Sequence, residues 1–218
     1  MSRRPVDLLA LAIFAALSYS VTQGYTLSYD QSISEWVEGW GRPQLDYFML
    51  AITHCGDMLT LAAVSVALSA FLFWGMRRKR AALAMLITVS LGYGIDNALK
   101  MTFARPRPQL SPLFVDPSSY SFPSGHAMNS MAVYGCAAFL LSQALPRRRW
   151  LFRATAAGLV VLIGTSRVYL DAHWPSDVLA GFAAGWILLS VVRSWYLHDS
   201  TRPEIDIPQN KQPGEHVD

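Results

Sequence analysis

Charged residues are scarce in this chain, and cysteine is nearly absent. Asp, Glu, Lys and Arg make up only 15% of the 218 residues, whereas 52% are hydrophobic and the mean hydropathy is positive. Length alone allows one or two soluble domains, but the distribution of the apolar residues argues against them. The two cysteines, Cys55 and Cys136, form no disulfide framework, and we expect both to be unpaired packing residues.

The apolar residues are gathered in six blocks, each near the length that crosses a bilayer. These blocks cover residues 6–24, 57–76, 81–99, 127–145, 150–166 and 176–197. No soluble core of this size needs six such blocks, so the sequence predicts an all-α, polytopic membrane bundle of six transmembrane helices. One domain then covers residues 1–197, and the polar segment 198–218 is predicted to be a disordered cytoplasmic tail. A cleaved signal peptide is the alternative interpretation of the first block.

The basic residues predict the orientation of these helices. With the N-terminus in the cytoplasm, 13 of the 18 Lys and Arg residues lie on the inner side, as the positive-inside rule requires. The five outer cations are Arg42, Lys100, Arg105, Arg107 and Arg167. The net charge of +3 follows from this topology and not from a nucleic-acid surface, so we expect no nucleic-acid partner.

The first outer loop, residues 25–56, has a helical pattern of its own. Ile33, Trp36, Val37 and Trp40 recur at the spacing of one helix face, and polar residues fall between them. The pattern predicts a short amphipathic helix that lies at the membrane interface, because tryptophan suits the headgroup level. Packing of this helix against the bundle is an equally weighted alternative.

Most outer cations, and two of the five histidines, lie in three short segments at the ends of apolar blocks. The first segment, KMTFARPRP, holds Lys100 and Arg107, and the prolines on both sides of Arg107 keep it in a bend. A guanidinium binds phosphate oxygens in a bidentate manner, and an ammonium acts as a point charge. Asp96 lies one helical turn before Lys100, so we expect it to position that ammonium.

The second segment, PSGH, covers residues 123–126 and opens the fourth predicted helix. A helix N-terminus offers free N–H groups and a positive dipole end, which suit a phosphate. Gly125 is expected to let a ligand approach the backbone, and Ser124 to cap the helix or to donate to an oxygen. Alone, this segment is only a helix-start signal, but His126 adds a titratable group.

The third segment, SRVYLDAHWPSD, adds the cation Arg167 and a His–Asp pair. His173 and Asp177 lie four residues apart, and a helix that begins between them lets the carboxylate reach back to the imidazole. Such a carboxylate fixes the tautomer of a nucleophilic histidine and stabilises its cation. A lone pair of this kind is more often structural, but a second histidine and three more cations on the same side favour catalysis. Asp171 either tunes His173 or faces away from it.

Together, the three segments resemble the signature of the type-2 phosphatidic acid phosphatase superfamily. The matching positions, in residue type, spacing and order, are Lys100-x6-Arg107-Pro108, Pro123-Ser124-Gly125-His126 and Ser166-Arg167-x5-His173-x3-Asp177. The resemblance covers about residues 30–195. Six helices fit the integral-membrane branch, whose members are similar to undecaprenyl diphosphate and phosphatidylglycerophosphate phosphatases.

The resemblance implies a metal-independent lipid phosphatase that needs no cofactor. His173 would attack phosphorus and form a phosphohistidine, Asp177 would support it, and His126 would protonate the leaving oxygen and then activate water. The residues implied to bind the phosphate are Lys100, Arg107, Ser124, Gly125 and Arg167. The sequence offers no competing metal site, because His54 and Asp57 have too few partners.

The predicted outward site suits a lipid phosphate or diphosphate in a bacterial inner membrane, with the site facing the periplasm or exterior. Undecaprenyl diphosphate is the slightly favoured substrate, because that lipid carrier is released on the outer side. Phosphatidylglycerophosphate or another phospholipid is the alternative. A lipid phosphotransferase would use the same histidine, whereas a non-catalytic binder or transporter would not need the full set of catalytic positions.

Overall fold

The computed structural model describes residues 5–108 and 120–199, and their regular structure is entirely helical. The helices are α1 (Pro5–Thr22), α2 (Leu27–Glu38), α3 (Pro43–His54), α4 (Met58–Ala70), α5 (Lys79–Phe103), α6 (Gly125–Ala144), α7 (Arg149–Tyr169) and α8 (Pro175–Asp199). A π-helical turn, Phe71–Gly75, extends α4, and a 3₁₀ turn, Pro146–Arg148, leads into α7. The predicted all-α fold is confirmed for these residues. The predicted tail lies outside them, apart from its first two residues, which belong to α8.

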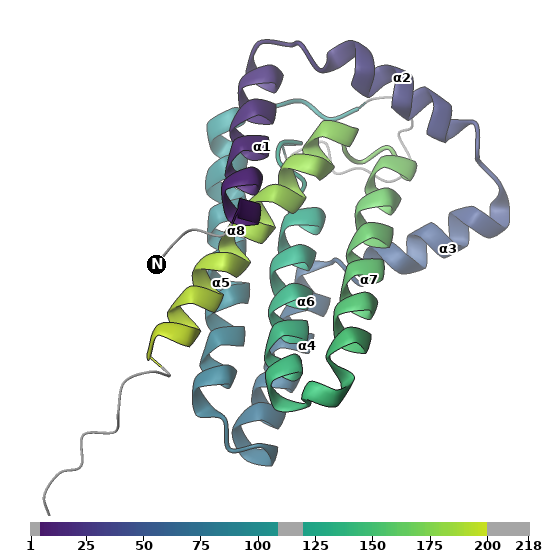
Figure 1. Cartoon of the computed structure of the whole chain (residues 1–218). Helices are drawn as coiled ribbons and strands as arrows, with labels where there is room; N and C mark the ends of the chain where they lie inside the picture. The colour runs from purple at the N-terminus through teal and green to yellow at the C-terminus, as the bar shows by residue number, and fades with distance from the viewer. Residues whose placement is uncertain (1–4, 109–119, 200–218) are drawn as a thin grey trace, which may run out of the picture.

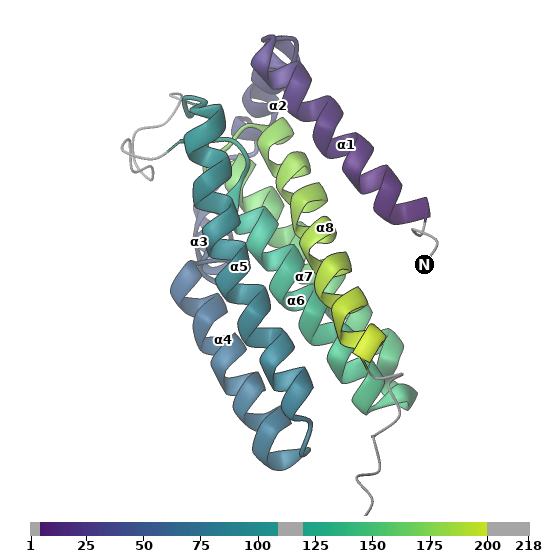
Figure 2. The same ribbon diagram turned by 90° about the vertical axis from the view of Figure 1, so that its left-hand side faces the viewer.

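The central helix of the bundle is α6. It packs against α8, α7, α5 and α4 (Figures 1 and 2), and 12 of its 20 residues are buried. Two glycines of α8 bring that helix close: a Cβ on Gly181 would lie 2.6 Å from the carbonyl oxygen of Ser124, and a Cβ on Gly185 would overlap the α6 backbone at Met128. The beginning of α8 is therefore held directly against the beginning of α6.

Within residues 5–108 and 120–199, five helical segments are long and apolar enough to cross a membrane. They are α1, α4 with its π-helical turn, α5, α7 with its 3₁₀ turn, and α8. Helix α6 coincides with the fourth predicted span but is not among these five. Its position explains the difference, because a helix enclosed by other helices meets protein and not lipid. Asn129, Ser130 and Ser142 are accordingly buried on it.

Residues 25–56, which the sequence predicted to be the first outer loop, contain two helices, α2 and α3, where the sequence predicted one. The predicted apolar stripe lies mainly on α2 but turns outward: Ile33 and Trp36 are exposed, and Val37 alone of the stripe is buried. The buried face of α2 also carries Asp30 and Ser34, and the helix contacts α7 and α8. The helix thus packs on the bundle through a largely polar face and presents its aromatic face to the surroundings.

Asp30 explains why the polar face turns inward. Its Oδ2 accepts hydrogen bonds from Arg105 Nη2 at 2.7 Å and Ser176 Oγ at 2.6 Å, and its Oδ1 accepts from the backbone N–H of Ser176 at 2.9 Å. Ser176 is the second residue of α8, so its N–H has no partner within the helix. A carboxylate at this position also meets the positive end of the helix dipole. Helix α2 therefore supplies the cap of α8.

Replacing Asp30 with alanine is expected to destabilise the protein by about 3–5 kcal/mol, because the buried Arg105 guanidinium and the start of α8 both lose a partner. Thermal unfolding in detergent, followed by tryptophan fluorescence, measures the change. Glu35→Ala on the exposed side of the same helix is the matched control and should change the stability by less than about 0.5 kcal/mol. Equal stability of the two variants would show that the Asp30 contacts contribute nothing.

Candidate active site

All eight residues predicted for the site lie at one end of the bundle, where α5 and α7 end and α6 and α8 begin (Figure 1). Lys100 and Arg167 lie in the last turns of α5 and α7, and His126 and Asp177 lie in the first turns of α6 and α8. Helix α5 continues for three residues beyond Lys100, to Phe103, although the third apolar block was predicted to end at residue 99. Segments far apart in the sequence are thus brought together by helix ends.

His173 is buried in this site, with 1% of its surface exposed. Its Nε2 lies 3.3 Å from Arg107 Nη1, and its Nδ1 lies 3.4 Å from Ser121 Oγ and 3.6 Å from Asp177 Oδ2. Burial, and then the positive charge of neighbouring cations with Arg107 first, hold the pKa of His173 well below its usual value. The imidazole is therefore neutral at pH 7, and one ring nitrogen keeps a free lone pair.

Three hydrogen-bond donors hold the Asp177 carboxylate, which also lies near His173. Its Oδ1 accepts from Arg105 Nη1 at 2.5 Å, and its Oδ2 accepts from the backbone N–H of Trp174 at 3.0 Å and from Ser121 Oγ. The predicted approach of Asp177 to His173 is present at 3.6 Å, on the Nδ1 side of the ring. Arg105 is one of the five predicted outer cations, but nothing in the sequence predicts that it holds this carboxylate.

Lys100, Asp96 and Gly125 form a close group at the junction of α5 and α6. Lys100 Nζ donates to Asp96 Oδ2 at 3.0 Å, as the four-residue spacing predicted. The same carboxylate fills the space in front of Gly125, where a Cβ would lie 2.6 Å from Oδ2. The glycine therefore permits the approach of Asp96, whereas the sequence predicted the approach of a ligand. Ser124 is the cap of α6, and its Oγ accepts from the N–H of Ala127 at 3.5 Å.

Arg107 and Arg167 bring two guanidinium groups to the surroundings of His173. Arg107 Nη1 donates to the carbonyl oxygen of Ala172 at 2.7 Å. Arg167 Nη1 donates to Thr53 Oγ1 at 2.7 Å, and its Nε is buried without a hydrogen-bond partner in the described part of the chain. A buried donor without an acceptor is costly, so the Arg167 Nε is poised to donate to an anion.

His126 is paired with Asp57, which the motifs did not identify. His126 Nε2 lies 2.8 Å from Asp57 Oδ1, and His54 Nδ1 lies 2.7 Å from Asp57 Oδ2. The hydrogen bond with His126, helped by the one with His54, lowers the pKa of Asp57 to about 2 against the opposing effect of burial. The carboxylate is therefore ionised at physiological pH and accepts a hydrogen bond from each of the two imidazole rings.

The turn between α3 and α4 therefore forms a further wall of the site. Besides the contacts of Thr53 and Asp57, the carbonyl oxygen of Cys55 accepts a hydrogen bond from Tyr134 Oη at 2.6 Å. Gly56 lies so close to α6 that a Cβ there would be 2.9 Å from Cδ2 of His126. Sequence reasoning missed this wall, because its partners are distant in the chain and no local pattern marks the turn.

Asp171 lies in the turn that follows α7 and is buried. Its φ of 54° lies in the left-handed region, which Asp tolerates better than most residues. This turn changes the chain direction two residues before His173. Asp171 thus helps to shape the backbone that presents the imidazole.

The structure also shows the state of the two cysteines and the arrangement of possible metal ligands. Cys55 and Cys136 are both free thiols. Across residues 5–108 and 120–199, no group of three or more His, Cys, Asp or Glu side chains is arranged to hold a metal ion. The pair of His54 and Asp57 instead adjoins His126.

These features define a class of protein. A helical membrane bundle that keeps a neutral, buried histidine among cations has the groups that phosphoryl transfer requires: a nucleophile and positive charge for the phosphate oxygens. Comparison with known proteins identifies the family. The chain belongs to the PAP2 superfamily, whose family model matches residues 81–200. It is an integral membrane lipid phosphatase of that superfamily.

The relatives extend the match over most of the chain. Phosphatidylglycerophosphatase B of Bacillus subtilis (strain 168) is 34% identical over 195 residues, which are 88% of this chain and 94% of that protein. The crystal structure of a transmembrane PAP2 type phosphatidylglycerolphosphate phosphatase from Bacillus subtilis aligns with a TM-score of 0.83 and 31% identity, covering 90% of this chain and 97% of that one. An undecaprenyl-diphosphatase of Sulfolobus acidocaldarius is 31% identical over 130 residues, 57% of this chain and 60% of that protein.

His173 is expected to remain mostly neutral at about pH 6, where roughly three quarters of free imidazole is charged. Nitrogen-15 NMR of the histidine-labelled protein in detergent measures the protonation, and His173→Gln assigns the resonance. The same shift affects stability, because below about pH 6.5 the unfolded chain binds a proton that the folded chain does not. Acid should therefore favour unfolding. An imidazole that titrates near pH 6.5 would contradict the assignment.

Proposed function

We propose that this protein hydrolyses a phosphate ester of a lipid through a phosphohistidine on His173. The observation that carries the proposal is the environment of this side chain. The ring is buried and neutral, Asp177 stands on its Nδ1 side, and its Nε2 faces the Arg107 guanidinium at 3.3 Å. A phosphate bound to Arg107 would therefore lie next to the nitrogen that has the free lone pair.

In the first step, His173 Nε2 forms a bond to phosphorus while the bond from phosphorus to the lipid oxygen breaks. His126 gives its proton to that leaving oxygen. Lys100, Arg107 and Arg167 stabilise the charge on the phosphoryl oxygens, and this electrostatic stabilisation accounts for most of the catalysis in reactions of this kind. The imidazolium that forms on His173 is stabilised by the Asp177 carboxylate.

In the second step, water replaces the histidine. His126, now neutral, takes a proton from a water molecule whose oxygen attacks phosphorus, and the bond from phosphorus to His173 Nε2 breaks. Inorganic phosphate leaves and both histidines return to their starting forms. Asp57 acts in both steps as a positioning residue, because its hydrogen bond to His126 Nε2 favours the imidazolium that protonates the leaving oxygen.

We further propose that all six long helical segments cross the membrane, α6 included, and that the site faces the outer side. The support is the excess of basic residues at the opposite ends of the helices. In this arrangement α2 lies at the outer interface with Tyr29, Ile33 and Trp36 exposed to headgroups. Asp30 holds the other face of that helix on the bundle.

Phosphatidylglycerophosphate is the substrate that we propose first. The sequence slightly favoured undecaprenyl diphosphate, but a relative that matches 88% of the chain is a phosphatidylglycerophosphatase. The Asp57–His126 pair adds support, because the alkoxide released from a phosphate monoester needs a proton more than a released phosphate does. Undecaprenyl diphosphate is the second candidate, supported by the relative from Sulfolobus acidocaldarius.

His173→Ala should reduce phosphate release by at least about 10⁴-fold, because the nucleophile is lost. His126→Ala should reduce release by about 10²–10⁴-fold from a lipid monophosphate and by less from a lipid diphosphate. The measurement is phosphate release from phosphatidylglycerophosphate and undecaprenyl diphosphate by purified, monodisperse protein. Full activity of His173→Ala would overturn the mechanism, and no release from either lipid by the wild type would overturn both substrates.

Asp57→Asn should lower kcat by about 10–100-fold for a lipid monophosphate and only slightly for p-nitrophenyl phosphate, whose leaving group needs little protonation. A merely structural defect would lower both rates alike. Asp46→Asn is the matched control, because Asp46 also accepts a hydrogen bond, from Tyr169 Oη at 2.5 Å, but does not contact His126. Equal losses for the two substrates would remove Asp57 from the proton-transfer step.

A further inference from the structure

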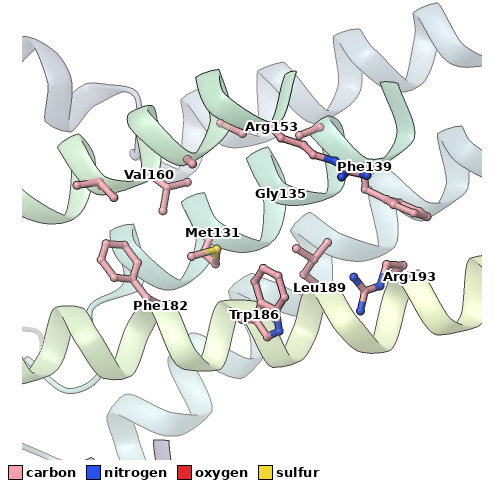
Figure 3. A pocket seen from close by; sticks show the side chains of 13 residues that line it. Met131, Gly135, Phe139, Arg153, Val160, Phe182, Trp186, Leu189 and Arg193 are labelled. Carbon is pink, nitrogen blue, oxygen red and sulfur yellow. The ribbon is translucent and has the colours of Figure 1, made fainter. Parts of the chain in front are cut away.

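An apolar groove of about 420 Å³ lies between α6, α7 and α8. Helices α7 and α8 each pack along α6 but contact one another little, so the groove lies between them with α6 as its floor (Figure 3). The groove is open because several residues that line it are small, namely Gly135 and Ala138 on α6 and Ala157 on α7. Phe182 and Trp186 line the α8 side.

Two arginines lie together at one end of the groove. Figure 3 shows Arg153 of α7 and Arg193 of α8 at this end, and Val160 and Phe182 at the other. Arg153 is exposed. Arg193 lies 3.7 Å from the Asp7 carboxylate of α1, which balances one of the two charges. The groove therefore combines an apolar length with a net positive end.

The length of the groove matches one leaflet of a bilayer. From Phe182 to Arg193 the axis of α8 rises about 16 Å, and half of the hydrocarbon core of a bilayer is about 15 Å. Arg193 also lies about 24 Å along α8 from Asp177. The positive end is thus far from the catalytic site and faces the opposite leaflet.

We propose that this groove binds one anionic phospholipid of the leaflet opposite the catalytic site. The lipid phosphate would bind Arg153 and Arg193, because guanidinium groups pair with phosphate oxygens in a bidentate manner. One acyl chain would lie along the groove. Arg147, Arg148 and Arg149 in the adjacent α6–α7 turn keep this end positive, as in other basic pockets that select anionic lipids. A zwitterionic lipid fits less well, since it brings its own cation to the arginines. The site is independent of which lipid is hydrolysed.

Photo-cross-linking tests the proposal on the full chain. The purified protein is reconstituted in phosphatidylcholine vesicles that contain a little phosphatidylglycerol with a diazirine on the acyl chain, and the adducts are mapped by mass spectrometry. Adducts are expected on the groove-lining parts of α6 and α8, near Gly135 and Trp186. A phosphatidylcholine probe with the same diazirine should label these positions several-fold less. Mapping separates this labelling from any adduct at the catalytic end.

Substitutions distinguish a specific lipid site from a nonspecific apolar surface. Arg153→Gln should lower groove labelling about fivefold, the factor expected for one lost cation at a membrane surface, and Arg153→Lys should keep most of it. Ala157→Phe, at an exposed position of α7, should fill the groove and abolish labelling there. Arg149→Gln removes a nearby charge that does not line the groove and should lower labelling much less than Arg153→Gln does. Equal labelling by both lipids, or no response to Arg153→Gln, would overturn the proposal.

Discussion

The arrangement of the site depends on one buried cation, Arg105. Its guanidinium lies 2.5 Å from the Asp177 carboxylate and 2.7 Å from the Asp30 carboxylate, with only 10% of the side chain exposed. A buried ion group of this kind is strongly destabilised when one partner is missing. The loop after α5, helix α2 and the beginning of α8 are therefore fixed relative to one another. The carboxylate beside the His173 ring is held in place through this contact, so α2, which is distant in the sequence, contributes to the geometry of the imidazole.

The carboxylates around the site are each engaged with a particular cation or histidine. Asp96 contacts Lys100, Asp57 contacts His126, and Asp177 contacts Arg105. Arg167 differs, because its hydrogen bond described above joins it to the Thr53 hydroxyl, and its buried Nε has no hydrogen-bond partner among the described residues. A guanidinium group in a site of low dielectric attracts an anion strongly. A phosphate dianion would supply the counter-charge that a hydroxyl does not.

The sequence predicted those parts of the protein that are encoded locally. Apolar block length located the long helices to within a few residues, and the three motifs located eight residues that the fold gathers at one end. Helix periodicity also detected α2, but it left open whether the apolar stripe faces the bundle or the membrane interface. Hydrophobicity alone cannot show that a single carboxylate, Asp30, has donors waiting for it on another helix. The stripe of tryptophans therefore faces away from the protein core.

The partners of the site residues were not predictable, because they are contacts between distant segments. Arg105 is one more arginine in a basic segment, and nothing local shows that Asp177 is its partner 72 residues later. Asp57 reaches His126 across 69 residues. The sequence predicted that Gly125 allows a close approach to the backbone, but it did not predict which group approaches. That group is the Asp96 carboxylate. Motifs thus identify candidate site residues, and the fold decides how each is held.

In the proposed mechanism, a phosphoryl group attached to His173 would be shielded from bulk solvent, because the ring has only 1% exposure. Its lifetime would then depend on which acceptor enters the space beside His126. The proposed nucleophile would be identical whether phosphate is released to water or passed to an alcohol of another lipid. The ratio of hydrolysis to transfer would therefore depend on the entry of water and competing hydroxyl groups, which the walls around the two histidines control.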